Sequence, residues 1–255
     1  MSRDLLRIAL FGASGRMGTR VLSASAGRNG VEVGLALVRP DNPNLGLPCP
    51  QASGKGRGGL SFETASKASW EGIGAVVDFS SPEGLREAID YCGRYRIPLV
   101  SGTTPLTDGL DRLLDDLAVQ VPVLHAANFS RAVTALTQIL PKLRAWLDDS
   151  FDAGVLDVHH ATKKDAPSGT ARALAAAWEG QPQGQRVATV SLRLGRALGD
   201  HALWIEGQGE RIEIWHRVQD RRVFAEGALD AVLALSGRPP GRYTLDSLWG
   251  PGSDF

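Results

Sequence analysis

The sequence predicts an α/β protein with an N-terminal doubly wound parallel-sheet domain and a C-terminal α+β domain with an open mixed sheet. Three observations support this fold class. In the first half, short and nearly continuous apolar runs alternate with amphipathic helical stretches, a pattern typical of a parallel sheet covered on both faces. The first of these runs leads directly into a glycine-rich turn and a helix. After residue 129 the pattern changes to one long helix followed mainly by strands.

Short segments rich in aliphatic and β-branched residues are the expected strands of the N-terminal sheet. They are Arg7–Phe11, Glu32–Leu37, Ala75–Phe79, Leu99–Ser101 and Val121–Ala126, with helical patterns between them. The segment Asp41–Gly59 is rich in Pro, Gly, Asn and Ser, so we expect a long surface loop there.

The second half begins with a helix and continues with strands. The helix has one apolar face, formed by Val133, Leu136, Ile139, Leu140, Leu143 and Leu147. The expected strands are Val155–His159, Val187–Leu194, Ala202–Glu206 and Arg211–Arg217, and a helix is expected at Arg222–Leu235. An open sheet of this kind needs a cover, which favours a homo-oligomer.

The composition argues against several classes of partner. The chain of 255 residues carries 28 Lys plus Arg and 28 Asp plus Glu, so no overall basic charge favours nucleic acid or an anionic membrane. No apolar run is long enough for a signal peptide or a membrane span, so we expect a cytoplasmic protein. Cys49 and Cys92 stand far apart without metal-ligand spacing and are expected to be reduced thiols.

The glycine-rich turn Gly12–Gly18, with the sequence GASGRMG, lies between the first strand and a helix. This is the context in which backbone N–H groups approach a pyrophosphate at a helix N-terminus. The spacing is GxxGxxG and not GxGxxG, and glycine-rich turns also serve tight packing. In its position after the first strand, the turn favours dinucleotide binding.

The end of the second strand bears on the choice of cofactor. Folds that prefer NAD carry an acidic residue there, which binds the adenine ribose, whereas this chain has Val38 followed by Arg39. Arg39 is either a solvated loop cation or a forked contact for the 2′-phosphate of NADP.

The segment from residue 157 to residue 171 concentrates chemically active side chains in one strand-to-helix connection. It contains His159, His160 and Lys163, and Ser168 is a suitable N-cap for a helix that begins with Gly169 and Thr170. Together with Lys163, that helix start predicts an anion site. Taken singly, each residue fits an ordinary capped helix with solvated lysines and structural histidines; the density of groups favours a site. Sequence alone leaves open whether Asp157 or Asp165 orients an imidazole.

No metal site is expected. Adjacent residues of a strand point to opposite faces, so His159 and His160 are poorly placed as a ligand pair, and no third ligand stands at a useful spacing. His125, His201 and His216 are expected to be structural histidines, with His201 in a loop that follows Gly199.

With these residues in hand, the chain resembles the dihydrodipicolinate reductase family over nearly its whole length. The most specific element is HHxxKxDAPSGTA, which begins at His159. The other matching motifs are GASGRMG at Gly12–Gly18, DFSSPEG at Asp78–Gly84, SGTT at Ser101–Thr104, AANFS at Ala126–Ser130, GERIEIWH at Gly209–His216 and FAEGAL at Phe224–Leu229.

The resemblance implies a domain division and a set of roles. Residues 1–129 form a dinucleotide-binding domain on which residues 240–255 pack, and residues 130–239 form a substrate-binding and tetramerisation domain. The implied cofactor residues are Gly12, Ala13, Ser14, Gly15, Arg16, Met17 and Arg39, with Gly102, Thr103, Thr104, Ala126, Ala127, Asn128 and Phe129 around the nicotinamide. His159 and Lys163 are implied in proton transfer, and His160, Ser168, Gly169 and Thr170 in substrate binding.

The implied reaction is the NAD(P)H-dependent reduction of 4-hydroxy-tetrahydrodipicolinate, a small dicarboxylate, in lysine and diaminopimelate biosynthesis by a homotetramer. NADPH is the expected cofactor, with NADH accepted more weakly. The alternatives are a paralogous reductase of another cyclic imine carboxylate and a non-catalytic NADP(H) sensor. This chain departs from the family pattern at Val38, which replaces an acid, at Asp157, where Glu is common, and at Arg131-Ala132, which replaces small residues.

Overall fold

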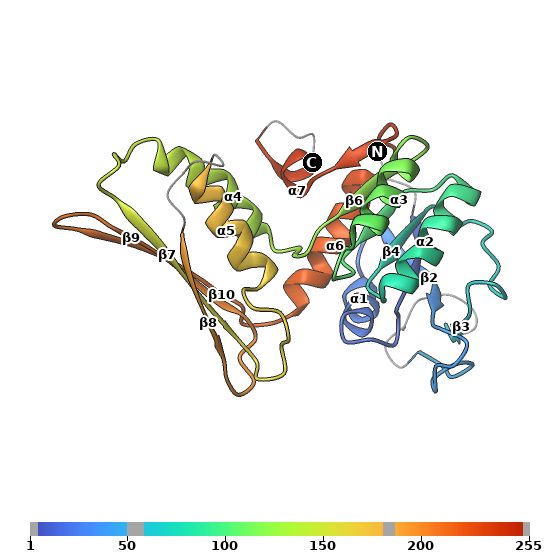
Figure 1. The fold of residues 1–255 in the computed structure, drawn as a ribbon. Coiled ribbons are helices and arrows are strands. Elements are labelled where there is room, and N and C mark those ends of the chain that lie inside the picture. The colour runs from blue at the N-terminus through green and yellow to red at the C-terminus, as the bar shows by residue number, and fades with distance from the viewer. Residues whose placement is uncertain (1–4, 50–58, 181–186, 252–255) are drawn as a thin grey trace. The chain divides into compact units, whose positions relative to one another are not determined.

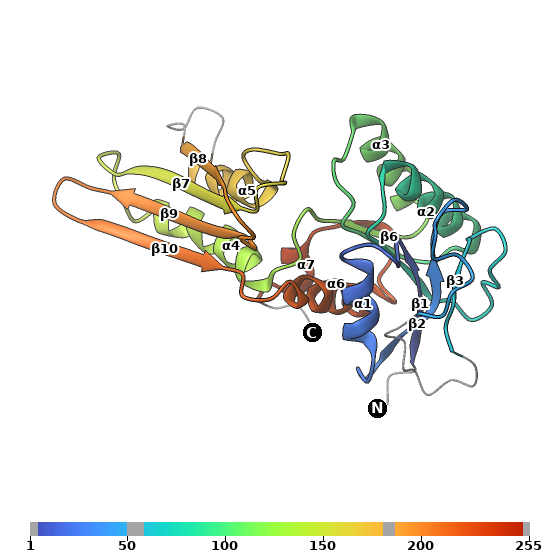
Figure 2. The same ribbon diagram turned by 90° about the horizontal axis from the view of Figure 1, so that it is seen from below.

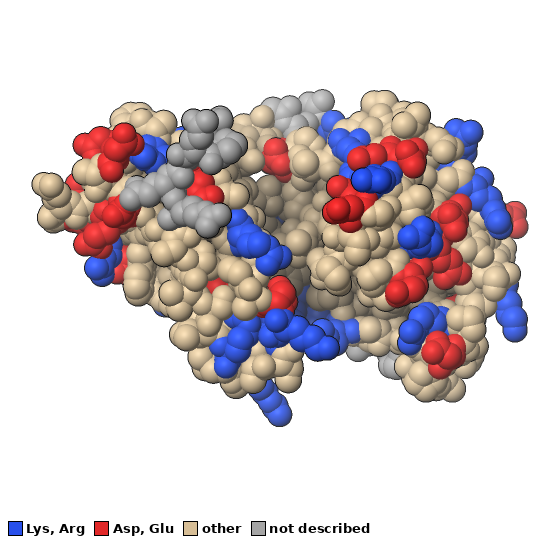
Figure 3. All heavy atoms as spheres, in the orientation of Figure 1, with Lys and Arg blue, Asp and Glu red and all other residues tan. Residues whose placement is uncertain are grey.

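The structure is a computed structural model that describes residues 5–49, 59–180 and 187–251 (Figure 1). The chain forms two compact units, one of residues 1–129 with 222–255 and one of residues 130–221. On the face drawn in Figure 3, Lys and Arg side chains are interspersed with Asp and Glu side chains over both units.

The first unit is built on a parallel sheet with the strand order β11-β6-β5-β4-β1-β2-β3. The strands are β1 (Leu6–Phe11), β2 (Val31–Leu37), β3 (Phe62–Glu63), β4 (Ala75–Asp78), β5 (Leu99–Ser101), β6 (Pro122–His125) and β11 (Gly241–Tyr243). The prediction of a doubly wound parallel-sheet domain is therefore confirmed.

Helices cover both faces of this sheet. They are α1 (Gly18–Ser25), α2 (Pro82–Tyr95), α3 (Asp108–Ala118), α6 (Arg222–Leu235) and α7 (Leu245–Trp249). Side chains of a strand alternate between faces, so Ile8 and Leu10 of β1 enter a core with α1 and α6, whereas Ala9 and Phe11 enter a second core with α2 and α3. This alternation, with both faces buried, explains the continuous apolar character of the strands.

The positions of α6, β3 and β11 differ from the sequence-based description. The expected second domain extended to residue 239, but α6 belongs to the first unit. Helix α6 joins the first unit because much of its surface is apolar and packs on α1. At Gly227 it lies so close to the backbone of Phe129 that a Cβ would collide with the Phe129 carbonyl oxygen. The strands β3 and β11 were not predicted, because they are only two and three residues long. Residues 50–58 of the expected loop and residues 252–255 lie outside the described ranges.

The second unit is a four-stranded mixed sheet in the order β10-β9-β7-β8, as the α+β prediction required. Its elements are α4 (Arg131–Arg144), β7 (Asp152–His159), α5 (Gly169–Glu179), β8 (Ala188–Arg193), β9 (Asp200–Glu206) and β10 (Arg211–Arg217). Both helices lie on one face of the sheet (Figure 2). The other face exposes apolar side chains, among them Val190, Leu192, Trp204 and Trp215.

Both cysteines are buried and form no disulfide with each other. Burial, with a smaller contribution from Glu63, raises the pKa of the Cys49 thiol to about 11. Burial also raises the pKa of Cys92 well above its usual value. These thiols are therefore protonated at neutral pH. Among the described residues, no helix has the length and apolarity needed to cross a membrane.

Candidate active site

The turn after β1 requires glycine for steric reasons. Gly12 has φ +72°, and a Cβ there would collide with the backbone of Phe79. A Cβ on Gly18 would collide with the carbonyl oxygen of Gly12. Helix α1 then begins after Met17 without a side-chain cap. A close turn followed by an uncapped helix start is suited to an anionic group that approaches the backbone.

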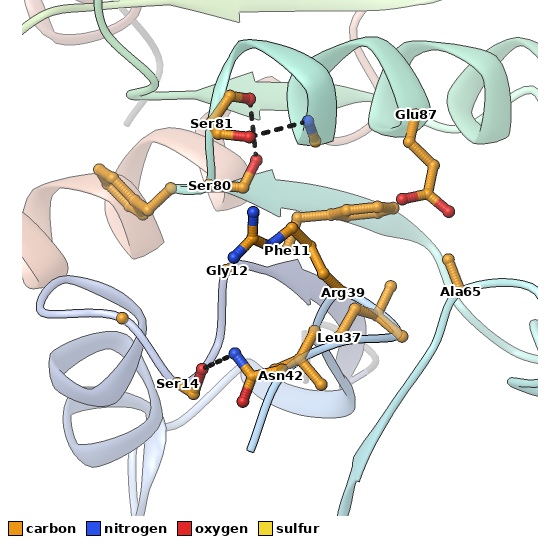
Figure 4. Close-up of a pocket in the computed structure, with 14 residues that line it drawn as sticks. Phe11, Gly12, Ser14, Leu37, Arg39, Asn42, Ala65, Ser80, Ser81 and Glu87 are labelled. Carbon is orange, nitrogen blue, oxygen red and sulfur yellow. Dashed lines mark hydrogen bonds between the residues drawn. The ribbon is translucent and has the colours of Figure 1, made fainter. Parts of the chain in front are cut away.

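A cavity of about 300 Å³ opens beside this turn (Figure 4). It is lined by Phe11, Gly12, Ser14, Gly15, Leu37, Val38, Arg39, Asn42, Ala65, Phe79, Ser80, Ser81, Gly84 and Glu87. Four of the predicted cofactor residues, Gly12, Ser14, Gly15 and Arg39, are in this lining, whereas Ala13, Arg16 and Met17 are not. Sequence reasoning missed Asn42, whose amide donates a 3.0 Å hydrogen bond to the Ser14 hydroxyl.

Arg39 has features of both interpretations left open by the sequence. Its side chain is 68% exposed and lies 3.5 Å from Asp41, as expected of a solvated loop cation. It also lines the cavity, into which its guanidinium points in Figure 4. A charged donor at the mouth of a cavity is placed where an entering phosphate can pair with it.

A buried carboxylate holds the loops that follow β4 and β5. Asp78 is fully buried and accepts 2.7 Å hydrogen bonds from the hydroxyls of Ser101 and Thr103. Burial raises the pKa of Asp78, although the hydrogen bonds from Ser80, Ser101 and Thr103 oppose this shift. The carbonyl oxygen of Thr103 in turn accepts a hydrogen bond from the His125 ring at 2.9 Å, which attaches the end of β6.

The remaining predicted cofactor residues lie in the loops at the carboxyl ends of β5 and β6. Phe129 is 2% exposed, and its ring packs edge-on against Phe79 with centroids 5.6 Å apart. A Cβ on Gly102 would press on the same two rings. Ligands of open parallel sheets bind at the carboxyl edge. The fold therefore places Gly102–Thr104 and Ala126–Phe129 at the same edge as the glycine turn.

In the second unit, strand β7 ends at His159, and the structure separates the roles of the two aspartates. The Asp157 carboxylate lies 2.8 Å from Nδ1 of His159. The Asp165 carboxylate lies 2.8 Å from Nζ of Lys163. Asp157 is thus the group that contacts an imidazole, and Asp165 is the partner of the lysine.

Asp157 is held as an anion although it is buried. Its Oδ2 accepts hydrogen bonds from Arg193 Nη2 at 2.9 Å, the Ser168 backbone N–H at 2.9 Å and the Ser191 hydroxyl at 3.0 Å. Burial alone would raise the pKa of Asp157, but these bonds, led by that of Arg193, hold it well below its usual range. A permanent negative charge therefore stands beside His159.

His159 and Lys163 are partly accessible, with 13% and 22% of their side chains exposed. Burial lowers the pKa of His159, the charge of Asp157 opposes the shift, and Lys163 adds to it. The pKa of Asp165 would rise through burial, but its hydrogen bond and ion pair with Lys163 lower it. At neutral pH the site therefore combines an imidazole that is mostly neutral with the ion pair of Lys163 and Asp165.

The other predicted substrate residues open helix α5. The Ser168 hydroxyl accepts a hydrogen bond from the Ala171 N–H at 3.1 Å, which makes it the N-cap that the sequence predicted. Gly169 and Thr170 form the first turn, where the helix dipole is positive. The His160 ring lies 2.8 Å from the Thr162 hydroxyl. All the predicted catalytic and substrate residues thus fall between the end of β7 and the start of α5.

His201 was expected in a loop, and that expectation is wrong: it belongs to β9, opposite Asp157, and is 2% exposed. Strand pairing brings ligand atoms of Asp157, His159 and His201 within 4.8 Å of one another. No third potential ligand stands at a useful spacing from His159 and His160 along the sequence, but the fold brings His201 and Asp157 close to His159 in space. The carboxylate of this group, that of Asp157, already pairs with the positive charge of Arg193. The absence of a metal site stays a prediction.

Comparisons with known proteins agree over the length of the chain. The family model described as "Dihydrodipicolinate reductase, N-terminus" matches residues 6–129, and "Dihydrodipicolinate reductase, C-terminus" matches residues 132–248. A 4-hydroxy-tetrahydrodipicolinate reductase of Xanthomonas euvesicatoria pv. vesicatoria is 36% identical over 97% of this chain and 99% of its own length. One of Alkalilimnicola ehrlichii is 32% identical over 96% of this chain and 98% of its own.

A solved structure shows the same fold. The dipicolinate-bound dihydrodipicolinate reductase from Paenisporosarcina sp. TG-14 has a TM-score of 0.73 at 19% sequence identity, covering 94% of this chain and 97% of that one. At this identity the likeness concerns the fold, which both chains share over nearly their whole lengths.

Proposed function

The chain belongs to the dihydrodipicolinate reductase family, and on this premise we propose that it reduces 4-hydroxy-tetrahydrodipicolinate to tetrahydrodipicolinate, a step of lysine and diaminopimelate biosynthesis. The observation that carries the proposal is a likeness that extends over both units. The family models match residues 6–129 and 132–248, and the relatives of that activity cover at least 96% of the chain. The proton donors that a non-catalytic sensor would be expected to lose are present.

The first unit is the proposed site of the nicotinamide cofactor. The steric requirement for glycine at residues 12 and 18 and the adjacent cavity fit a dinucleotide whose pyrophosphate lies at the start of α1. Gly12–Met17 and Arg39 would hold its phosphates, and Gly102–Thr104 with Ala126–Phe129 would surround its nicotinamide. When bound, the reduced nicotinamide supplies the hydride.

The second unit is the proposed site of the substrate. Lys163 and the positive end of α5, which begins after Ser168, bind a carboxylate, and His160 contributes to the same site. His159 and Lys163 are the proton donors for the ring. Asp157 orients the His159 ring and favours its protonated form as the proton is transferred.

The exposed apolar face of the second sheet supports an oligomer, and the homotetramer that the family resemblance implies would cover it. Val190, Leu192, Trp204 and Trp215 are 40–58% exposed on the face opposite the two helices. Contiguous exposed apolar side chains on a sheet indicate an interaction surface. A second copy of this chain presents the same apolar surface, so it is a suitable cover.

The proposal of a dicarboxylate substrate predicts which inhibitors bind. We expect pyridine-2,6-dicarboxylate to compete with the substrate at least about tenfold more tightly than pyridine-2-carboxylate, a difference of ~1.4 kcal/mol for the second anion contact. Steady-state inhibition constants measure this directly. The same assay with cyclic imines that carry one carboxylate tests the paralogue alternative. Equal inhibition by the two pyridines, or faster turnover of a monocarboxylate imine than of 4-hydroxy-tetrahydrodipicolinate, would argue for the paralogue.

The end of β2 predicts a preference for NADPH. An acid there would accept hydrogen bonds from the ribose of NADH and repel a 2′-phosphate, whereas Val38 does neither and Arg39 offers a charged fork. We expect kcat/KM to favour NADPH by about tenfold or more, ~1.4 kcal/mol. Arg39→Ala should remove most of this preference and Val38→Glu should shift it toward NADH. Arg112→Ala, on α3 and outside the cavity lining, is the matched control. Unchanged discrimination in Arg39→Ala would show that the phosphate is read elsewhere.

A further inference from the structure

The loop that follows β2 is attached to the glycine turn by a hydrogen bond between two side chains. The backbone N–H of Ala13 donates to the carbonyl oxygen of Leu37 at 3.1 Å, which joins the glycine turn to the end of β2. Beyond that strand, the amide of Asn42 donates to the hydroxyl of Ser14 at 3.0 Å. This second bond holds the loop that begins at Arg39 against the glycine turn.

The four residues from Arg39 to Asn42 form a tight turn. The backbone N–H of Asn42 donates to the carbonyl oxygen of Arg39 at 3.0 Å. Pro40 occupies the second position of this turn, which suits its fixed φ. The Arg39 side chain is 68% exposed, so its place at the cavity depends mainly on where the turn lies. A bond that fixes Asn42 therefore also fixes the start of the Arg39 side chain.

A second contact determines the orientation of the Asn42 amide. Its Oδ1 accepts a 2.9 Å hydrogen bond from the backbone N–H of Asn44. A backbone N–H can only donate, so the oxygen of the amide must lie on this side and its NH₂ group must lie beside Ser14. The Ser14 oxygen is therefore the acceptor in this pair, and its own hydrogen is not used in the bond.

The Ser14 hydroxyl differs from the other two serine hydroxyls of the cavity lining. The hydroxyl of Ser80 donates to a buried carboxylate, and that of Ser81 interacts with the carboxylate of Glu83. Within the described part of the chain, the Ser14 hydroxyl has Asn42 as its one hydrogen-bond partner, and Ser14 is partly exposed in the cavity wall. The Ser14 hydrogen is thus the one that can donate into the cavity.

The charges of the lining place an anion on the same side of the cavity. Arg39 is the cation of the lining, and Glu87 is its acid. Figure 4 shows Glu87 on the far side of the cavity from Ser14 and Asn42. A phosphate between the Arg39 guanidinium and the Ser14 hydroxyl would accept from a charged and a neutral donor and would stay away from the carboxylate.

We propose that Asn42 is a positioning residue for the 2′-phosphate of NADPH and thereby contributes to cofactor specificity. Through the turn it holds Arg39 at the cavity, and through Ser14 it directs a hydroxyl hydrogen toward the same phosphate. NADH lacks this phosphate, so the contribution of Asn42 favours NADPH alone. The inference rests on the proposed function, because it assigns a nicotinamide dinucleotide to this cavity.

The ratio of kcat/KM for NADPH to kcat/KM for NADH distinguishes positioning from general support of the fold, which would affect both cofactors alike. We expect Asn42→Ala to lower this ratio about 3- to 10-fold, as for the loss of one neutral hydrogen bond. Asn42→Ser keeps an oxygen that can accept from the Asn44 N–H but is too short to reach Ser14, so the ratio should fall equally. A wild-type ratio in Asn42→Ser would overturn the inference.

The matched control is Asn44→Ala, in the same loop but outside the cavity lining. It keeps the backbone N–H that orients Asn42, so the ratio should stay within about twofold of the wild-type value. An equal fall in Asn44→Ala and Asn42→Ala would show that any change in this loop has the same effect, and would count against a specific role of Asn42.

A double-mutant cycle tests whether Asn42 acts through Ser14. Ser14→Ala removes the same hydrogen bond from its other side, together with the donor for the phosphate. We expect the cofactor ratio to fall at least as far in Ser14→Ala as in Asn42→Ala, and the double variant to lie within about twofold of Ser14→Ala. Additive losses would show that Asn42 acts without Ser14 and would reject the inference.

Calorimetric titration with 2′,5′-ADP and with 5′-AMP examines the phosphate contact without the substrate. The wild type should bind 2′,5′-ADP more tightly, and Asn42→Ala should lose about 3- to 10-fold more affinity for 2′,5′-ADP than for 5′-AMP. A wild type that binds neither nucleotide, or both equally, would reject the proposed cofactor site or its NADPH preference, and the inference with it. A wild type that prefers 2′,5′-ADP, with the preference unchanged in Asn42→Ala, would reject the inference alone.

Discussion

Replacing His159 by Gln, or Lys163 by Ala, is expected to lower kcat by about 10²- to 10⁴-fold, the usual effect of losing a positioned general acid. Both side chains stand at the end of β7 and in the loop that leads to Ser168, with Asp157 and Asp165 as their respective partners. Both are partly exposed, so the variants should fold like the wild type. Steady-state kinetics at saturating substrate measures the loss.

The matched control is Lys164→Ala, which removes the exposed neighbouring ammonium and should leave kcat within about twofold, as expected of a surface substitution. The pH profile separates the two donors. Burial lowers the pKa of His159 from its ordinary value, so the protonated fraction of His159 increases as the pH falls toward the lowered pKa. The rise of the rate toward acid pH should be absent in His159→Gln. Near-wild-type kcat in both variants would remove them from the mechanism.

Asp157→Asn is expected to have the largest effect on stability. The change removes the charge that pairs with Arg193, whose side chain is only 16% exposed, and leaves the guanidinium buried without its partner. Breaking a buried pair in this way lowers the free energy of unfolding by about 3–5 kcal/mol. It also loosens the His159 ring, so kcat should fall in the fraction that remains folded. Urea unfolding at pH 7 measures the first effect.

The pH dependence of this difference has a definite sign. The folded-state pKa of Asp157 is lowered, so its contribution to stability is present above the unfolded value, about 3.9, and is lost as the pH falls toward the folded one. The gap between wild type and Asp157→Asn should be constant from pH 8 to pH 5 and shrink below about pH 4. Asp165→Asn, at a carboxylate that is 49% exposed, is the control and should cost under about 1 kcal/mol. Equal losses of unfolding free energy in the two variants would contradict the description of Asp157 as the buried carboxylate that pairs with Arg193.

The sequence predicted the features that are encoded locally. Strand and helix types, the glycine turn and the Ser168 cap follow from patterns a few residues long, and the structure agrees with them closely. The proposed site residues of the second unit could also be identified from the sequence, because they all lie in one short segment, His159 to Thr170. The fold class followed from the alternation of apolar runs with helices.

Features created by long-range pairing could not be predicted in this way. Arg193 and His201 reach Asp157 and Ser168, respectively, only through strand register, at separations of more than 30 residues. His216 contacts His201 from the neighbouring strand. Helix α6 is buried on much of its surface, so its sequence is apolar on several sides. Such a pattern does not indicate which of the two units the helix packs against. Asn42 faces the cavity because its loop returns to Ser14, which no local pattern encodes.

Transfer of the hydride from the nicotinamide to 4-hydroxy-tetrahydrodipicolinate can be followed directly with an isotope label. Purified protein is mixed with NADPH carrying deuterium at the transferable position of the nicotinamide and with substrate freshly generated by dihydrodipicolinate synthase. We expect NADPH to be oxidised in proportion to substrate, and we expect mass spectrometry to find tetrahydrodipicolinate one mass unit heavier than the unlabelled compound. The His159→Gln and Lys163→Ala variants should form it far more slowly. No oxidation of NADPH or NADH with this substrate, or oxidation without a deuterated dicarboxylate product, would rule out the proposed reaction.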